Sequence, residues 1–274
     1  MATTTQISAP PRTASPLALW HLLSLDAPTV AALWTFFIAR ATHTALPFAT
    51  PAAMFLVVWI LYAADRLLDS RHLRSPGRAR NAELEARHFF HHRHRRAFLA
   101  IIPIVAIAVT TLLPNLLPTT LHLYVIEGVF LFGWFLLVHT TRSHLPKELV
   151  VGLYFAAATF TPTLVRRPQL ATTLLLAYAA LFASLCILNC LFIRAWEDRM
   201  GSSHRQLTIT TAAIGLLSLV GLATSAPAIP GACALAAGTL LAIHRLRDRL
   251  SRTHLRAAAD LALLTPALIL PFVR

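Results

Sequence analysis

Residues 170–195 have the sequence LATTLLLAYAALFASLCILNCLFIRA, and this stretch decides the fold class. Its one charged residue is Arg194, and it is longer than the roughly 20 apolar residues that a helix needs to cross a bilayer. Similar apolar segments lie on both sides of it along the chain. Alanine and leucine dominate them, without the alternating polarity of a membrane β-barrel strand. The sequence therefore predicts an all-α integral membrane protein.

The composition of the whole chain supports this class. Of the 274 residues, 57% are hydrophobic and only 13% are Asp, Glu, Lys or Arg, whereas an ordinary soluble domain has about 25% charged residues. The mean hydropathy is +0.64. The three cysteines, Cys186, Cys190 and Cys233, are too few and wrongly spaced for a disulfide framework or a zinc site. The composition thus argues against a soluble domain and against a structural zinc site.

Nine apolar segments are bounded by proline, glycine or charged residues. They cover residues 27–42, 49–65, 97–114, 119–139, 148–165, 170–195, 206–225, 228–244 and 257–273. We expect nine transmembrane helices in one domain, residues 17–274, after a disordered cytoplasmic tail at 1–16. With the N-terminus in the cytoplasm, 20 of the 24 Lys and Arg residues fall on the cytoplasmic side, as the positive-inside rule requires. The predicted topology is N-in and C-out in the inner (plasma) membrane.

The basic cytoplasmic loop at residues 66–96 needs a separate explanation, because charged patches also bind nucleic acids. Phe89 and Phe90 are adjacent in this loop rather than interleaved with the arginines, and so short a segment does not build a nucleic-acid-binding fold. Topology and contact with anionic membrane lipids account for the charge. No nucleic-acid partner is expected.

Acidic residues at the ends of the spans are the most informative feature, because a carboxylate at mid-membrane costs about 2.5 to 3.5 kcal/mol on insertion scales. Asp65 and Asp69 end the second span, and their spacing of four places both on one helix face. Asn189, Ile193 and Glu197 form a stripe of the same period at the end of the sixth span. Two such helix ends facing each other would form a cage of oxygen ligands suited to Mg²⁺.

The phosphate groups of a substrate would complete this magnesium site. Basic residues near the two helix ends can balance the phosphate charge. They are Arg66, Arg71, Lys147, Arg194 and Arg199. The alternative is that the acids only pair with neighbouring arginines and cap the helices at the membrane interface.

With these motifs the chain resembles the UbiA superfamily of intramembrane prenyltransferases, of the hydroxybenzoate polyprenyltransferase type, over nearly its whole length. Asp65 and Asp69 match the two acids of the family's first motif, while Leu61 stands where the family has Asn. The segment from Lys147 to Gly152 is also similar to the family.

The second acidic motif of the family is matched in part. Asn189 and Glu197 are in register with it, as is the glycine at position 201, while Ile193 replaces a central Asp. Asp198 and Arg199 correspond to the family's Asp-Arg pair but are displaced by one position.

The resemblance implies a nine-helix UbiA-like bundle that transfers a prenyl group from a prenyl diphosphate to a hydrophobic, aromatic or lipid-like acceptor, with Mg²⁺ as cofactor. The implied metal ligands are Asp65, Asp69, Asn189, Glu197 and Asp198. The implied diphosphate-binding residues are Arg66, Arg71, Lys147, Asn189, Arg194 and Arg199. The candidate catalytic residues are Asp65, Asp69 and Glu197, together with Asp260. Asp260 lies one turn into the ninth span and is a candidate base for the acceptor or a packing contact that shares a proton. Glu127, in the fourth span, is a second candidate base or a packing contact.

The sequence is also compatible with two other functions. The stretch 88–94 contains His-x-x-His-His, the spacing of a histidine box in membrane di-iron oxygenases, and His139 and His144 have the spacing of another box. The order of these boxes is reversed relative to those enzymes, and a third box is absent. The second alternative is a non-catalytic UbiA-like protein that binds a lipid or a partner, which the departures at Leu61 and Ile193 favour.

Overall fold

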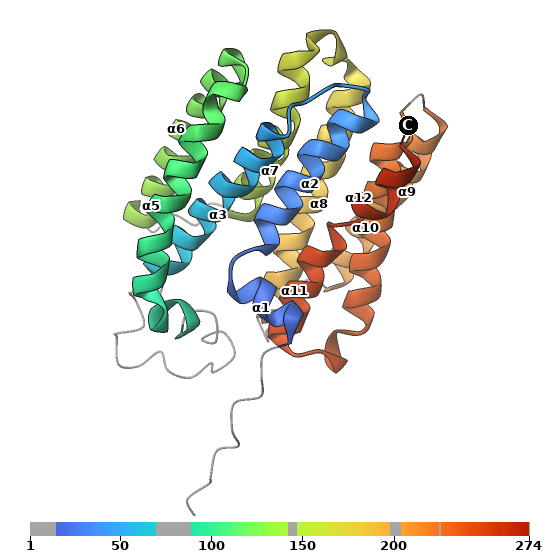
Figure 1. Ribbon diagram of the computed structural model, residues 1–274. Helices are drawn as coiled ribbons and strands as arrows, with labels where there is room; N and C mark the ends of the chain where they lie inside the picture. Colours follow the sequence, from blue (N-terminus) through green and yellow to red (C-terminus); the bar gives the residue numbers. More distant parts are fainter. Residues whose placement is uncertain (1–14, 70–88, 142–146, 198–203, 225, 274) are drawn as a thin grey trace, which may run out of the picture.

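A computed structural model describes residues 15–69, 89–141, 147–197, 204–224 and 226–273, and these residues contain helices and turns without any strand. The long helices lie side by side in a bundle (Figure 1). The helices of the described part include α1 (Pro16–Leu22), α2 (Asp26–Ala41), α3 (Ala49–Asp69), α5 (Arg95–Leu112), α6 (Pro118–Thr141), α7 (Lys147–Arg166), α8 (Thr173–Glu197), α9 (His204–Val220), α10 (Ala228–Arg245), α11 (Arg252–Ala262) and α12 (Pro266–Ile269). The predicted all-α class is confirmed for the described residues.

Among the described residues, six helices are long and apolar enough to cross a membrane, namely α3, α5, α7, α8, α9 and α10, with the 3₁₀ turns that extend α5 and α9. The number rises to eight if two bent pairs are each one span: α1 with α2, bent by 89°, and α11 with the segment Pro266–Phe272, bent by 42°. The chain therefore has the helices of a multi-pass membrane protein. The number nine stays a prediction.

The first helix begins earlier than the sequence predicted. The Ser15 hydroxyl accepts a hydrogen bond from the Ala18 amide at 3.2 Å, and Pro16 is the first helical residue. Ser15 is therefore the N-cap and Pro16 occupies the first helical position. The serine hydroxyl satisfies one unpaired amide of the first turn. Helical structure thus starts at Pro16, the last residue of the segment expected to be a disordered tail, and residues 1–14 of that tail lie outside the described part.

A sharp bend separates α1 from α2. Ser24 has a φ of 59°, in the left-handed region that L-residues rarely adopt. Its amide donates to the His21 carbonyl at 3.1 Å, and its hydroxyl is 3.2 Å from Nε2 of His91. This bend lays α1 across the end of the bundle beside α11 (Figure 1). The N-terminal apolar segment is therefore not a single straight helix.

The sequence predicted one continuous helix over residues 257–273, and this prediction was wrong. Helix α11 begins at Arg252 and ends at Ala262, and α12 begins at Pro266. Proline has no amide hydrogen to donate to the preceding turn, so the regular helix stops before it. The break leaves the Leu263 carbonyl without a backbone donor among the described residues.

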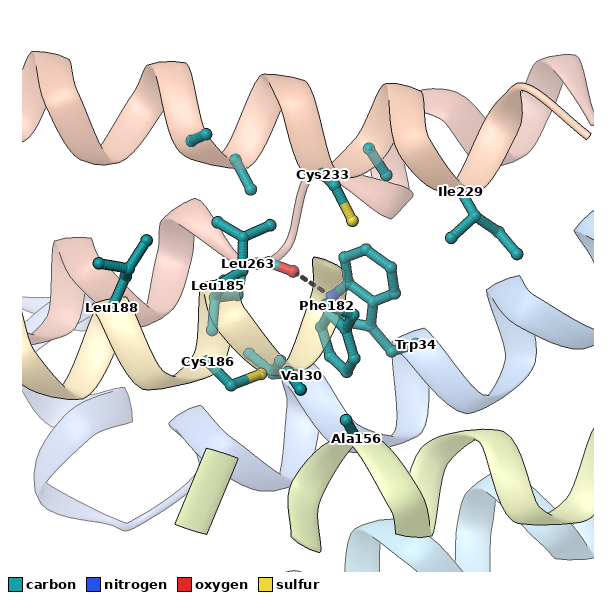
Figure 2. Packing of buried hydrophobic residues seen from close by; sticks show 14 of the residues in the cluster. Val30, Trp34, Ala156, Phe182, Leu185, Cys186, Leu188, Ile229, Cys233 and Leu263 are labelled. Carbon is teal, nitrogen blue, oxygen red and sulfur yellow. Dashed lines mark hydrogen bonds between the residues drawn. The ribbon is translucent and has the colours of Figure 1, made fainter. Parts of the chain in front are cut away.

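The core lies where α2, α8, α10 and α11 meet (Figure 2). Trp34 of α2 is fully buried and stacks on Phe182 of α8, with ring centroids 4.0 Å apart. Its indole nitrogen donates to the Leu263 carbonyl at 2.8 Å. One side chain therefore fills the core and also satisfies the carbonyl that the helix break exposes.

We expect the Trp34→Phe variant to lower the free energy of unfolding by about 1 to 3 kcal/mol, because the buried Leu263 carbonyl loses its donor. The matched control is Trp20→Phe. Trp20 donates to the Thr29 hydroxyl at 3.3 Å, which itself bonds the Leu25 carbonyl, so no buried acceptor is left unsatisfied. Unfolding of the detergent-purified proteins measures both effects. Equal stability of the two variants would show that the indole hydrogen bond contributes nothing.

Helices α7 and α8 approach closely at Gly152. A Cβ atom at this position would lie 2.4 Å from Cγ1 of Ile187 and 2.9 Å from its backbone nitrogen. Such small residues let membrane helices pack backbone to backbone. The glycine in the segment 147–152 therefore has a packing role that the sequence alone did not reveal.

The Gly152→Ala variant should destabilise the bundle by about 1 to 3 kcal/mol, the usual cost of overpacking. Gly238→Ala is the matched control, since a Cβ there would meet nothing within 4 Å. Alanine is the better helix former, so the control should be neutral or more stable by up to about 1 kcal/mol. Both are compared by unfolding in detergent, and a neutral Gly152→Ala would contradict the close packing of α7 on α8.

Candidate functional site

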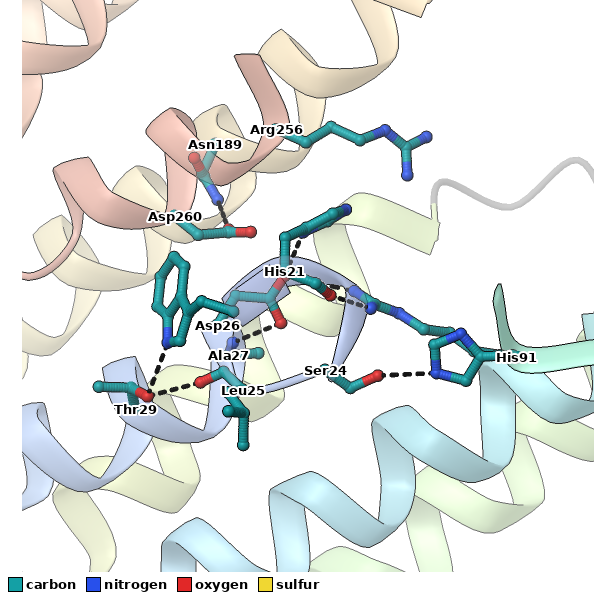
Figure 3. Close-up of polar contacts among 12 residues, drawn as sticks. His21, Ser24, Leu25, Asp26, Ala27, Thr29, His91, Asn189, Arg256 and Asp260 are labelled. Atoms are coloured by element: carbon teal, nitrogen blue, oxygen red, sulfur yellow. Dashed lines mark hydrogen bonds and ion pairs between the residues drawn. The ribbon is translucent and has the colours of Figure 1, made fainter. Parts of the chain in front are cut away.

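Five helices contribute side chains to a polar group at one end of the bundle (Figure 3). We call His21 of α1, Asp26 of α2, Arg66 of α3, Asn189 of α8 and Asp260 of α11 the buried acid–base cluster. All except the half-buried Asp260 are 5% exposed or less. Charged groups inside an apolar bundle are costly and are usually paired or functional.

His21 and Asp26 form the shortest contact of the cluster. Nδ1 of His21 lies 2.5 Å from Oδ2 of Asp26. The second carboxylate oxygen, Oδ1, accepts the Ala27 amide at 3.0 Å. Asp26 is also the first residue of α2, where the helix dipole favours a negative charge. The carboxylate is therefore held on both oxygens.

Arg66 links this pair to α3. One guanidinium nitrogen, Nη2, lies 3.3 Å from Oδ2 of Asp26, and the other, Nη1, donates to the His21 carbonyl at 2.6 Å. The guanidinium supplies the cation that a buried carboxylate needs. The sequence predicted a diphosphate-binding role for Arg66, whereas the structure shows its side chain engaged with Asp26 and His21.

Asp260 lies on the other side of Asp26. Its Oδ1 accepts a hydrogen bond from the Asn189 amide at 2.8 Å. His21, Asp26 and Asp260 each place one possible ligand atom within 4.8 Å of the other two. Among the described residues, this is the one group with the spacing of a metal site. Two carboxylates this close repel unless a proton or cation lies nearby. Arg66 neutralises one negative charge, so the cluster has room for one proton shared by the three side chains.

The end of α8 is tied to α11 and to α7. Glu197 forms an ion pair with Arg256, one turn before Asp260 on α11. Arg194 forms an ion pair of 2.9 Å with Glu148 at the start of α7. Asn189 and Glu197 of the second acidic motif are thus both engaged with α11.

The first acidic motif lies in the last turn of α3. The helix runs to Asp69, so Asp65 and Asp69 are one turn apart on it, as their spacing predicted. Asp65 is exposed, and the side chain of Asp69 lies outside the described part. Lys147 is exposed at the first residue of α7. The remaining predicted site residues, Arg71, Asp198 and Arg199, lie outside the described residues.

The histidine-rich stretch does not form a metal group in the described residues. His91 is completely buried, stacks on Phe98 at 4.4 Å and bonds Ser24, whereas His92 and His94 are exposed. The three are not among the side chains with metal-ligand spacing. His88 and His144 lie outside the described residues, as does the side chain of His139.

Glu127 is distant from the cluster in sequence and packs on a different pair of helices. It accepts a hydrogen bond from the Thr161 hydroxyl of α7 at 2.7 Å. Nearby, the Tyr124 hydroxyl donates to the Ala158 carbonyl at 3.2 Å. Pro162 cannot donate to that carbonyl, so Tyr124 supplies the missing hydrogen bond. These contacts give Glu127 a packing role between α6 and α7.

Sequence reasoning missed His21, Asp26 and Arg256. Asp26 stands at the edge of the first apolar segment, where an acid looks like an ordinary helix start. Arg256 lies four residues before Asp260, so both share one face of α11. That four-residue spacing was the one signal in the sequence for a role of Arg256. Its ion-pair partner on α8, Glu197, is 59 residues away in the chain.

Comparisons with known proteins do not identify the chain. No family model matches it, and neither a curated protein nor a solved structure matches it.

Replacing Arg66 by Met should cost about 3 to 5 kcal/mol, because the buried Asp26 carboxylate loses its cation. Arg40→Met is the matched control. Arg40 is exposed and donates to the Val273 carbonyl at 3.4 Å, so its loss should change stability by less than about 0.5 kcal/mol. Adding Asp26→Asn to Arg66→Met should recover part of the loss. A double variant as unstable as Arg66→Met in chemical unfolding would refute this account of the pair.

Proposed function

We propose that the chain is a UbiA-like intramembrane prenyltransferase, which transfers a prenyl group from a prenyl diphosphate to a hydrophobic acceptor. The observation that carries the proposal is that the helices of both acidic motifs enter one polar cluster. Arg66 of α3 reaches Asp26, and Asn189 of α8 reaches Asp260, while Asp26 and Asp260 are neighbours. A buried polar group between two motif-bearing helices is typical of a functional site in a membrane protein.

The proposal includes nine spans in the inner membrane. The six helices and two bent pairs account for eight. Helix α6 is 24 residues long, which exceeds the length needed to cross a bilayer, and we assign it as the ninth. The N-terminus is then cytoplasmic by the distribution of basic residues.

Asp65 and Asp69 fit the magnesium ligands in this proposal. Both stand in the last turn of α3 on one face, and Asp65 is exposed at the helix end. Two carboxylates with substrate phosphate oxygens are a usual ligand set for Mg²⁺. The ion would neutralise the charge of the departing diphosphate. Asp198 would belong to the same ligand set.

The other predicted site residues have positioning and charge roles in this proposal. Asn189 and Glu197 hold Asp260 and Arg256 of α11, and direct metal ligation by either would first require these contacts to open. Arg194, whose side chain is 63% exposed, and Lys147 supply positive charge at the ends of α8 and α7. Arg71 and Arg199 add to this charge in the proposal.

A non-catalytic protein that binds a lipid or a partner is the second candidate. The observation in its favour is that Leu61, at the position of the family's Asn, is 46% exposed on α3 and carries no polar group. Ile193 likewise provides no carboxylate on α8. Such a protein would keep the bundle without a complete diphosphate site.

Binding of radiolabelled geranylgeranyl diphosphate to the detergent-purified full chain distinguishes these candidates. We expect saturable binding with Mg²⁺ that EDTA abolishes. The Asp65→Asn/Asp69→Asn double variant should bind at least about tenfold more weakly, a loss that even an indirect partner of a bound metal causes. The control is Asp248→Asn, whose side chain is 83% exposed in the turn before α11. It should bind like the unmodified protein.

The outcomes separate the two candidates. Binding that requires Mg²⁺ and the two aspartates supports the transferase. A well-folded protein that binds no prenyl diphosphate contradicts the transferase and favours the non-catalytic candidate. Equal weakening by Asp248→Asn would show a general charge effect instead of a specific site.

A further inference from the structure

Within the described part of the chain, His21 forms a hydrogen bond through one ring nitrogen only. Nδ1 bonds Asp26, whereas Nε2 makes no hydrogen bond to any described residue. The His21 side chain is almost fully buried and keeps 5% of its surface exposed. Figure 3 shows this edge of the ring pointing away from Asp26. With its proton held on Nδ1 by a carboxylate, a neutral imidazole presents a lone pair at Nε2.

The contacts of Arg66 connect this histidine to the proposed diphosphate site. The guanidinium bonds both the His21 carbonyl and the Asp26 carboxylate. Its backbone position is next to Asp65 and three residues before Asp69. The His21–Asp26 pair is therefore anchored directly to the helix turn that carries the first acidic motif.

Prenyl transfer requires a proton acceptor. The bond between the allylic carbon and the diphosphate oxygen breaks, and its electron pair leaves with the diphosphate. The acceptor then forms a new bond to that carbon and loses the proton of its hydroxyl or aromatic C–H group. Inside an apolar bundle little water is present to take the proton, so the acceptors at hand are the departing diphosphate and a side-chain base beside it.

We propose that His21, oriented by Asp26, takes this proton at Nε2. The inference rests on the proposed prenyl transfer. Asp26 and Arg66 are positioning residues. Four charged groups surround the ring from the packed helices: Asp26, Arg66, Asp260 and Arg256. Asp260, predicted from the sequence as the base, has Oδ1 occupied by Asn189, and one of its carboxylate oxygens lies within 4.8 Å of a His21 ring nitrogen.

Carbethoxylation of histidines with diethylpyrocarbonate, followed by peptide mass spectrometry, tests this role on the full chain. We expect His21 to react and the completely buried His91, whose Nε2 bonds Ser24, to stay unmodified. Geranylgeranyl diphosphate with Mg²⁺, at about ten times its Kd, should slow the modification of His21 about tenfold by occupancy. The Asp26→Asn variant should react more slowly at His21, because the ring loses the carboxylate that increases its basicity. His21→Gln should keep the Mg²⁺-dependent binding, because His21 acts on the acceptor.

Three results would overturn the inference. Diphosphate binding that leaves the modification rate of His21 unchanged contradicts its role, while the proposed diphosphate site stands. A folded protein without any diphosphate binding contradicts both. A stoichiometric transition metal that the His21→Gln variant lacks would make His21, Asp26 and Asp260 metal ligands instead of a proton-accepting group.

Discussion

The buried ion pair of Asp26 and Arg66 is the interaction on which the rest of the site depends. It joins the start of α2 to the end of α3, and through the His21 carbonyl it also holds α1 across the end of the bundle. A carboxylate without a cation would be too costly in this apolar surrounding. The pair therefore determines where His21 can lie, and His21 in turn lies next to Asp260.

The two regions of the bundle have different physical roles. The core around Trp34 and Phe182 is apolar, and its one indole donor compensates for the carbonyl that the helix break at Pro266 leaves unpaired. The polar end gathers charges that the core excludes. Stability comes mainly from the first region, whereas the second holds the groups to which the proposed function assigns diphosphate binding and proton transfer.

Part of the site was predictable and part was not. The four-residue spacing of Asp65 and Asp69 is a local property, so the shared helix turn was predictable. The contact of Asp26 with Arg66 joins residues 40 positions apart, and that of Asn189 with Asp260 joins residues 71 apart. No periodicity within one helix indicates which face of another helix it meets. His21 and Asp26 were missed for this reason.

The sequence by itself determined that the chain is helical and rich in apolar segments, because hydropathy and helix length depend only on neighbouring residues. The tertiary structure alone decided that the chain bends at Ser24, that Trp34 donates to the Leu263 carbonyl and that Glu197 pairs with Arg256. These features depend on which helix faces come together. That choice is made by packing and by the need to neutralise each buried charge with a partner that is distant in the chain.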